Sequence, residues 1–265
     1  MRKAGSHDRA SAGAPARAAA AEARELAALP RAALERMAAA GAAALECRRV
    51  LEKTGDNVVG ELLRDAGTFY EWTHYPEGDV YDFESHAQYY YHAHPRGERP
   101  GEHGHFHTFL RPAGLKQGSL ARAPRPARLP GNKLPADPRA AQCHLVAIAM
   151  SERGVATQLF TTNRWVTDET WYAAADAVAL VDRFAIELAR PSYLVNRWIT
   201  AMLRLFRPQI ASLLVERDQA LEAWQQRRPQ APALEDRALE VVSRLEISVE
   251  DQVERVASAL RRARP

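Results

Sequence analysis

Histidine is the residue type in this chain whose distribution could support chemistry. Seven of the nine histidines fall between His74 and His107. Imidazole changes charge near neutral pH, acts as a general acid or base, and is the commonest metal ligand in proteins. Five of the seven form a closely spaced set, called the histidine cluster below: His92, His94, His103, His105 and His107.

The two halves of the histidine cluster lie in segments with the alternation of β-strands. Side chains two residues apart share one face of a strand, so each half places its histidines on a common face. The eight-residue connection PRGERPGE separates the two segments and fits a hairpin loop. Opposite side chains in an antiparallel pair have Cβ atoms about 4.5–5.5 Å apart. We therefore predict that the two halves converge on one face of a hairpin.

A bound transition metal would explain why five imidazoles share one face, because protonated imidazoles would repel one another there. Neutral imidazole is a good ligand for Zn, Cu and Fe. We predict that the whole histidine cluster binds a metal, with its identity open among Fe, Zn and Cu. Three protein ligands with one open coordination position are typical of a catalytic site. The leading hypothesis is therefore a metal-dependent hydrolase or oxidoreductase.

Three side chains near the histidine cluster are candidates for proton transfer. Tyr90 shares the face of His92 by strand parity, and Glu98 and Glu102 lie in the connection. A carboxylate there can complete a metal's coordination or fix the tautomer of a ligating histidine. We predict that Tyr90, Glu98 and Glu102 take part in catalysis. Histidines outside the cluster are expected to have structural roles: His74, His86 and His144.

Two short stretches resemble motifs of known families. HAHPRGE resembles the first metal-binding motif of the cupins, which implies His92, His94 and Glu98 as ligands. HGHFHTF resembles the histidine-triad motif of nucleotide hydrolases and transferases, in which the middle histidine attacks a phosphate. That resemblance implies His105 as a nucleophile and leaves His92 and His94 without a role.

A longer resemblance covers most of the chain. The stretch HAHPRGERPGEHGHFHTFLRP, followed later by LFTTNRWVTDETW, is similar to a bacterial family catalogued only as a domain of unknown function. The similarity extends from about residue 35 to about residue 225, and it implies no activity. Two alternatives to the metal-dependent enzyme stay open: a non-catalytic metal sensor, chaperone or storage protein, and a histidine-triad-like nucleotide enzyme.

The histidine cluster lies in a β-rich middle part of the chain. Aromatic and β-branched residues with alternating polarity favour strands there. The predicted strands are Val80–Glu84, His86–His94, His103–Leu110, Cys143–Met150 and Val155–Thr162. We expect an α+β fold with an antiparallel sheet of four to five strands, flanked by N- and C-terminal helices.

Composition and helix-breaking residues outline the flanking segments. Residues 1–16 are predicted to form a disordered tail, and residues 17–226 a single α+β domain. The predicted helices are Arg17–Leu29, Arg31–Lys53, Asn57–Asp65 with Asp56 as cap, Trp171–Arg190, Tyr193–Gln226 with a kink before Pro208, Leu234–Glu246, and Val249–Arg262 with Ser248 as cap. The last two form a predicted C-terminal helical hairpin, residues 227–265. Its apolar stripe packs either within the chain or against a second copy in a homodimer.

A Pro-rich basic segment, residues 111–139, interrupts the β-rich part. It contains six prolines, seven Lys or Arg residues and one Asp, so its charge is +6, whereas the whole 265-residue chain carries +3. We predict either a lid that attracts an anionic small-molecule substrate or a solvated insertion. Aromatic residues are not interleaved with the basic ones, which argues against nucleic-acid binding.

The cysteine count and the hydropathy pattern indicate where the protein works. Cys47 and Cys143 are too few for a disulfide framework, which fits a reducing compartment. The most apolar C-terminal stretch contains three arginines, and the N-terminus has no apolar core of a secretory signal. We therefore expect a cytoplasmic protein with no membrane partner.

Overall fold

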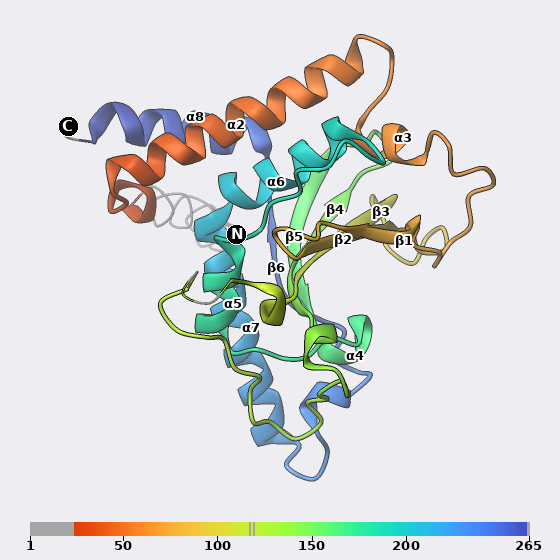
Figure 1. The fold of residues 1–265 in the computed structure, drawn as a ribbon, viewed down its shortest axis with the longest axis vertical. Helices are drawn as coiled ribbons and strands as arrows, with labels where there is room; N and C mark the ends of the chain where they lie inside the picture. Colours follow the sequence, from red (N-terminus) through yellow and green to blue (C-terminus); the bar gives the residue numbers. More distant parts are fainter. Residues whose placement is uncertain (1–23, 117, 119, 264–265) are drawn as a thin grey trace, which may run out of the picture.

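A computed structural model describes residues 24–116, 118 and 120–263 of the chain. In this part, the strands form one antiparallel sheet, and the long helices pack against one of its faces (Figure 1). The fold class is therefore α+β, as predicted. The predicted tail, residues 1–16, and residues 17–23 of the first predicted helix lie outside the described residues.

The sheet has six strands in the described part of the chain, rather than four to five. The strands are β1 (Tyr75–Tyr81), β2 (Ala87–His92), β3 (Gly104–Leu110), β4 (Cys143–Met150), β5 (Ala156–Thr162) and β6 (Val241–Glu246). Their order in the sheet is their order in the chain, so each strand pairs with its sequence neighbours. The strand β4 has the predicted bounds and is buried along its whole length.

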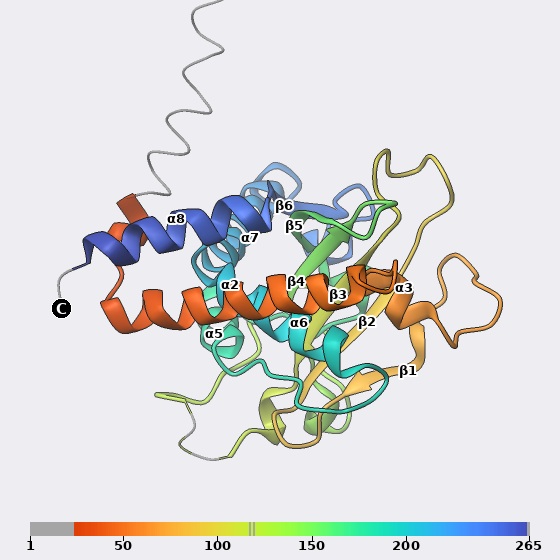
Figure 2. The same cartoon turned by 90° about the horizontal axis from the view of Figure 1, so that it is seen from above.

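Helices precede the sheet, connect its last two strands, and follow it. The α-helices are α2 (Arg31–Glu52), α3 (Val58–Leu63), α4 (Arg164–Thr167), α5 (Ala174–Val181), α6 (Tyr193–Leu205), α7 (Arg207–Arg227) and α8 (Val249–Arg262). Short 3-10 helices are η1 (Pro112–Gly114), η2 (Pro138–Ala140) and η3 (Ala233–Glu235). Viewed from above, α2 and α8 run beside each other across the helical side (Figure 2).

The main core lies between the helices and one face of the sheet. Phe106 and Ile148 of the sheet face Trp198 of α6 and Leu34 of α2 in one buried cluster. Val256 of α8 belongs to the same cluster, so the apolar stripe of α8 packs within the chain. Burying one such side chain stabilises the fold by about 1.5–3 kcal/mol. Because strand side chains alternate, this packing directs the other parity of β2 and β3 to the opposite face.

The first hairpin turns earlier than the sequence predicts. The predicted strand Val80–Glu84 is wrong at its end, because the Asp82 carboxylate accepts hydrogen bonds from the backbone N–H groups of Glu84 and Ser85. These bonds close a tight turn, and His86 has a positive φ of 60° within it. The strand β2 therefore begins at Ala87 and not at His86.

The predicted helix Leu234–Glu246 is wrong, because its second half is the strand β6. The predicted helical hairpin over residues 227–265 therefore contains only one long helix, α8. Apolar residues at positions 239, 242 and 245 fit a helical period, but residues 241–246 also alternate, and short segments do not separate the two patterns. The segment becomes a strand because it pairs with β5. Without β6, the backbone N–H and C=O groups along the outer side of β5 would lack partners.

The predicted helix Trp171–Arg190 is mostly wrong, because α5 covers only Ala174–Val181. Beyond α5 the chain is extended, and the Ile186 N–H donates to the Thr200 hydroxyl. These tertiary contacts replace the helical hydrogen bonds that local propensity favours. The predicted kink before Pro208 is confirmed as a break between α6 and α7 at Phe206.

Helix starts follow the capping chemistry of short polar side chains. The Ser248 hydroxyl accepts from the Asp251 N–H and caps α8, as predicted. The cap of α3 is Asn57 instead of the predicted Asp56: its side-chain oxygen accepts from Val59 and Gly60, each at 3.0 Å.

Candidate metal centre

The β2–β3 pairing brings three histidines together on the face opposite the helices. His92 lies directly across from His105, and Tyr90 lies across from His107. His105 and His107 are two residues apart on β3 and therefore share this face. The sequence predicted this convergence from strand parity, and it is confirmed for these three histidines, called the triad below.

The ligand atoms of the triad all lie within 4.8 Å of one another. The ring centroids are 4.5 Å apart for His92 and His105, 4.7 Å for His105 and His107, and 5.2 Å for His92 and His107. Only 8%, 1% and 0% of the surfaces of His92, His105 and His107 are exposed. Three buried imidazoles with this spacing can hold a metal ion.

Two triad nitrogens are buried without a hydrogen-bond partner among the described residues: His92 Nε2 and His107 Nε2. Leaving a buried polar atom unpaired costs about 1–3 kcal/mol. Two such atoms on neighbouring rings in one cluster need an explanation. A metal ion supplies one, because it accepts electron pairs from both nitrogens at once.

Burial keeps the triad neutral. It lowers the pKa of His92 to about 3, with smaller contributions from nearby His94, His74 and Arg99. It lowers the pKa of His105 and of His107 well below the usual value of histidine. Neutral imidazole is the form that binds a metal, so deprotonation adds no cost to binding at neutral pH.

Glu102 fixes the orientation of His105. Its Oε1 atom lies 2.5 Å from His105 Nδ1. Burial raises the pKa of the Glu102 carboxyl to about 7, although the Arg99 guanidinium opposes this shift. A proton on Nδ1 donates to this carboxylate and leaves Nε2 as the electron-pair donor. This carboxylate–histidine pair is the usual outer partner of a ligating imidazole.

His107 has its own outer partner in His144. His107 Nδ1 lies 3.0 Å from His144 Nε2, and His144 Nδ1 lies 3.5 Å from the Thr162 hydroxyl. Both rings are buried, and burial lowers the pKa of His144 to about 3. Only one of two neutral nitrogens in such a contact carries a proton. If His107 Nε2 donates its electron pair to a metal, the proton is on His107 Nδ1 and His144 Nε2 accepts it.

The other two histidines of the cluster are placed differently. The His94 ring lies 5.2 Å from the rings of both His92 and His105, beside the triad, and its Nδ1 is 3.3 Å from Glu98. His103 lies apart, because its Nδ1 is hydrogen-bonded to the Tyr91 hydroxyl at 2.6 Å. Strand parity places His103 with the triad, but β3 begins only at Gly104.

The predicted catalytic residues also differ in their surroundings. Glu102 contacts the triad directly, whereas Glu98 is half exposed and contacts only His94 among the triad's neighbours. Tyr90 is buried beneath His74, with the two rings stacked at 3.6 Å. Burial raises the pKa of Tyr90 well above its ordinary value, so its phenol stays protonated at neutral pH.

Sequence patterns missed two neighbours of the site. Trp72 precedes β1, and its ring lies 4.2 Å from that of His94. His144 was expected to be structural, but it bonds to the triad. A register shift between Thr108 and Phe109 sets which side chain of β4 reaches this face. An alternating pattern does not reveal such a shift, so the sequence held no usable signal for His144.

A cavity of about 840 Å³ lies on the β5–β6 side and is lined by neighbours of the triad but not by the triad histidines themselves. Its lining includes His94 and Glu102, which contact triad residues, and Ala149, which lies across from His105. Arg99 and Arg244 are on the same lining. Arg99 is ion-paired with Glu240, whereas Arg244 has no ion-pair partner among the described residues. The volume is in the range that binds small molecules.

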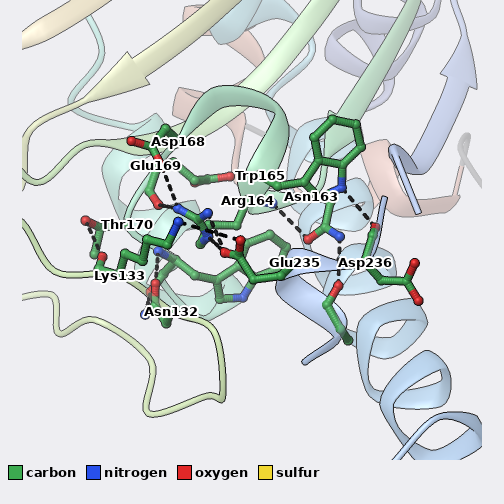
Figure 3. Close-up of polar contacts among 12 residues, drawn as sticks. Asn132, Lys133, Asn163, Arg164, Trp165, Asp168, Glu169, Thr170, Glu235 and Asp236 are labelled. Atoms are coloured by element: carbon green, nitrogen blue, oxygen red, sulfur yellow. Dashed lines mark hydrogen bonds and ion pairs between the residues drawn. The ribbon is translucent and has the colours of Figure 1, made fainter. Parts of the chain in front are cut away.

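The segment Asn163–Trp165 is hydrogen-bonded to the residues that precede β6, close to this cavity (Figure 3). The buried Arg164 donates from Nε to Glu235 at 2.6 Å and from another nitrogen to Asp168 at 2.8 Å. The Trp165 indole N–H donates to backbone carbonyls at positions 236 and 239, both at 3.0 Å. These bonds position residue 240 and the start of β6. The segment Asn163–Trp165 therefore has a structural role next to the cavity.

The basic segment 111–139 packs away from the triad in its described part. Arg122 is paired with Asp176 of α5 at 2.6 Å, and Lys133 with Glu235 at 3.6 Å. Between this segment and α7 lies a second cavity of about 660 Å³, lined mainly by apolar side chains such as Trp171 and Leu221. No histidine lines it, so it is separate from the triad.

Fold and site together define an α+β protein with a buried three-histidine centre on one hairpin of an antiparallel sheet. The chain belongs to the family described as a domain of unknown function, DUF6969, whose model matches residues 38–247. This confirms the resemblance to an uncharacterised family. No curated protein and no solved structure matches the chain. In the described part, none of the helices has the length and apolar character that a membrane span requires.

Proposed function

We propose that this protein binds one transition-metal ion through His92, His105 and His107, and that the bound ion serves a reaction on a small molecule. The observation that carries the proposal is the pair of buried, unpartnered nitrogens, His92 Nε2 and His107 Nε2. A third nitrogen is directed by the contact between His105 and Glu102. Three histidine ligands are compatible with Zn, Fe or Cu.

The neighbouring cavity supports catalysis over simple metal storage. Three protein ligands leave a coordination position for substrate, and the cavity is lined by His94 and Glu102, which contact triad residues. When bound, the ion would supply Lewis-acid or redox chemistry. Arg99 and Arg244 lie on the cavity lining together with four glutamates, Glu98, Glu102, Glu240 and Glu246, so the lining suits a small polar substrate.

The chain's own residues would divide the remaining work. Glu98 and His94 form a partly exposed acid–base pair at the cavity and suit proton transfer with a bound substrate. Glu102 would hold His105 in its ligating tautomer. Tyr90 is a hydrogen-bond donor instead of a base, because its phenol stays protonated.

The alternatives have weaker support. A nucleophilic His105 would need to reach a phosphate, but only 1% of its surface is exposed. A metal carrier must release its ion readily, and two of the three ligands are fully enclosed. Rapid loss of bound metal to a chelator would favour a carrier, and slow loss a resident ion.

Metal analysis of untagged protein, purified without chelators, tests the proposal. Inductively coupled plasma mass spectrometry should give about one equivalent of a single transition metal, as expected for one three-ligand site. His107→Ala should abolish binding, whereas His103→Ala should retain it, because His103 contacts Tyr91 and not the triad. No metal in the wild-type protein and no uptake on reconstitution would refute metal binding.

A further inference from the structure

A third cavity, on the helical side, has a different chemical character. It has a volume of about 520 Å³ and lies between α2 and α6. Its lining includes three arginines: Arg36 from α2, and Arg197 and Arg204 from α6. Because α2 and α6 pack against the sheet face opposite the triad, this cavity is independent of the metal centre. It is called the arginine groove below.

The three arginines of the arginine groove differ from most other helical arginines of this chain. Other arginines in or next to α2, α3 and α7 form ion pairs with carboxylates: Arg31, Arg48, Arg49, Arg64 and Arg207. Within the described residues, Arg36, Arg197 and Arg204 have no ion-pair partner. Like charges gathered on one cavity repel one another and raise the local potential for an anion.

Nearby acidic residues do not cancel this charge. Glu187 lines the same cavity, which leaves a local charge of +2 from three arginines and one carboxylate. Glu46 is close enough to Arg197 to be affected by its charge. However, Arg49 already binds both oxygens of Glu46, at 2.7 and 2.8 Å.

The shape of the arginine groove admits a compact ligand. Its lining includes small side chains, Ala39, Ala40 and Ala43 of α2 and Ala201 of α6. Arg197 and Arg204 are seven residues apart on α6, and two helical turns separate their Cα atoms by about 10 Å. Both side chains line the same cavity, so their long and flexible stems allow the guanidinium groups to bind one oxyanionic molecule together, each through paired N–H donors.

We propose that the arginine groove binds a phosphate-bearing small molecule with at least two negative charges, such as a diphosphate. A planar guanidinium matches two phosphate oxygens at once, which distinguishes such a site from a general positive surface. The volume of the groove lies in the range of small-molecule sites. This proposal does not depend on metal binding by the triad.

Isothermal titration calorimetry of the full chain with inorganic pyrophosphate at low ionic strength tests the proposal. We expect saturable binding that weakens as salt is added, because exposed charges are screened. The double variant Arg197→Ala/Arg204→Ala should weaken binding by at least about tenfold, since it removes two of the three guanidinium groups that would form charge-assisted hydrogen bonds with the ligand. All three side chains are exposed, so the variants should fold, and a thermal melt checks this.

Two control variants locate the binding. Arg207→Ala removes a nearby arginine that is already paired with Asp182, and it should leave the affinity unchanged. His107→Ala should also leave it unchanged, which excludes pyrophosphate bound at the metal centre. The proposal is overturned if the wild-type protein does not bind pyrophosphate, if the double variant binds it as tightly, or if either control loses as much affinity.

Discussion

Replacing His144 by phenylalanine tests how the outer partner of His107 contributes to metal binding. The two imidazole nitrogens lie 3.0 Å apart in the buried part of the site. Phenylalanine keeps an aromatic ring beside Phe109 and His107, but it has no nitrogen to accept the proton of His107 Nδ1. In the variant, His107 therefore loses its preference for the tautomer that leaves Nε2 free.

The expected loss is about 10–100-fold in metal affinity, the usual effect of removing an outer partner of a ligating histidine. This factor equals about 1.4–2.7 kcal/mol of binding free energy. A separate loss of folding stability, about 1–3 kcal/mol, is expected because a buried hydrogen bond is removed. Competition with a chromophoric zinc chelator measures the affinity, and urea denaturation of the metal-free protein measures the stability.

The matched control is His103→Phe, which makes the same replacement at a histidine bonded to Tyr91. It should leave metal affinity unchanged. His144→Gln should recover part of the loss, because the amide oxygen can accept the His107 proton. A folded His144→Phe protein with wild-type metal affinity would refute the tautomer argument, and so would an equal loss in His103→Phe.

Three further predictions follow from the site and its surroundings. Glu102→Leu should weaken metal binding by about 10–100-fold, and Glu102→Gln by less, because its amide oxygen still accepts from His105 Nδ1; equal losses in the chelator competition would contradict this role. Burial raises the pKa of the Glu169 carboxyl to about 8, so the unfolded state releases a proton that the folded state keeps between pH 4.5 and 8. The contribution of Glu169 to stability should therefore fall as pH rises through this window, by up to about 1.4 kcal/mol per pH unit. The difference in unfolding free energy between wild type and Glu169→Gln should accordingly change between pH 5 and pH 8 in urea denaturation; parallel profiles would count against it. The pKa of His92 and of His144 is lowered to about 3, so the unfolded state binds protons that the folded state does not between pH 3 and 6.5. The pKa values of His105 and His107 are lowered as well, so four histidines outweigh the two carboxyls of raised pKa, Glu102 and Glu169. The metal-free protein should therefore lose stability as pH falls below 6.5, and an unchanged denaturation midpoint from pH 7 to pH 4 would disprove this.

The alternation of side chains along a strand correctly predicted which face the triad occupies. The prediction failed for His103, which lies just outside its strand. His92, His105 and His107 lie inside paired strands, where alternation determines the face. His103 lies one residue before β3, where the backbone is no longer held by the ladder on both sides. The His103 ring is hydrogen-bonded there to the Tyr91 hydroxyl. The alternation of residues along the sequence does not predict this contact.

The fold was predictable where local and tertiary preferences agree. β4 is apolar at nearly every position and central in the sheet, so its bounds were predicted correctly. β6 and the chain after α5 were not, because both depend on distant partners. β6 is stabilised by β5, about 80 residues earlier in the chain, and Ile186 is bonded to Thr200 of α6. A local sequence window does not contain those partners.

The triad histidines are synthesised well before the last strand of the sheet, and this order affects how the candidate metal centre is assembled. All three triad histidines lie on the β2–β3 hairpin, within residues 92–107. β6 follows α4 to α7 in the chain, so it is synthesised after them. Contacts between near neighbours in sequence form faster than distant ones, because closing a short loop costs less entropy.

An ion could therefore reach the hairpin while its histidines are still open to solvent, before the later elements surround them. Binding at that stage would also stabilise the hairpin, because metal affinity for a folded site adds to folding free energy. The deep burial of His105 and His107 would then retain an ion acquired during folding. The metal supply at the time of synthesis, more than equilibrium exchange in the finished protein, would decide which ion the centre contains.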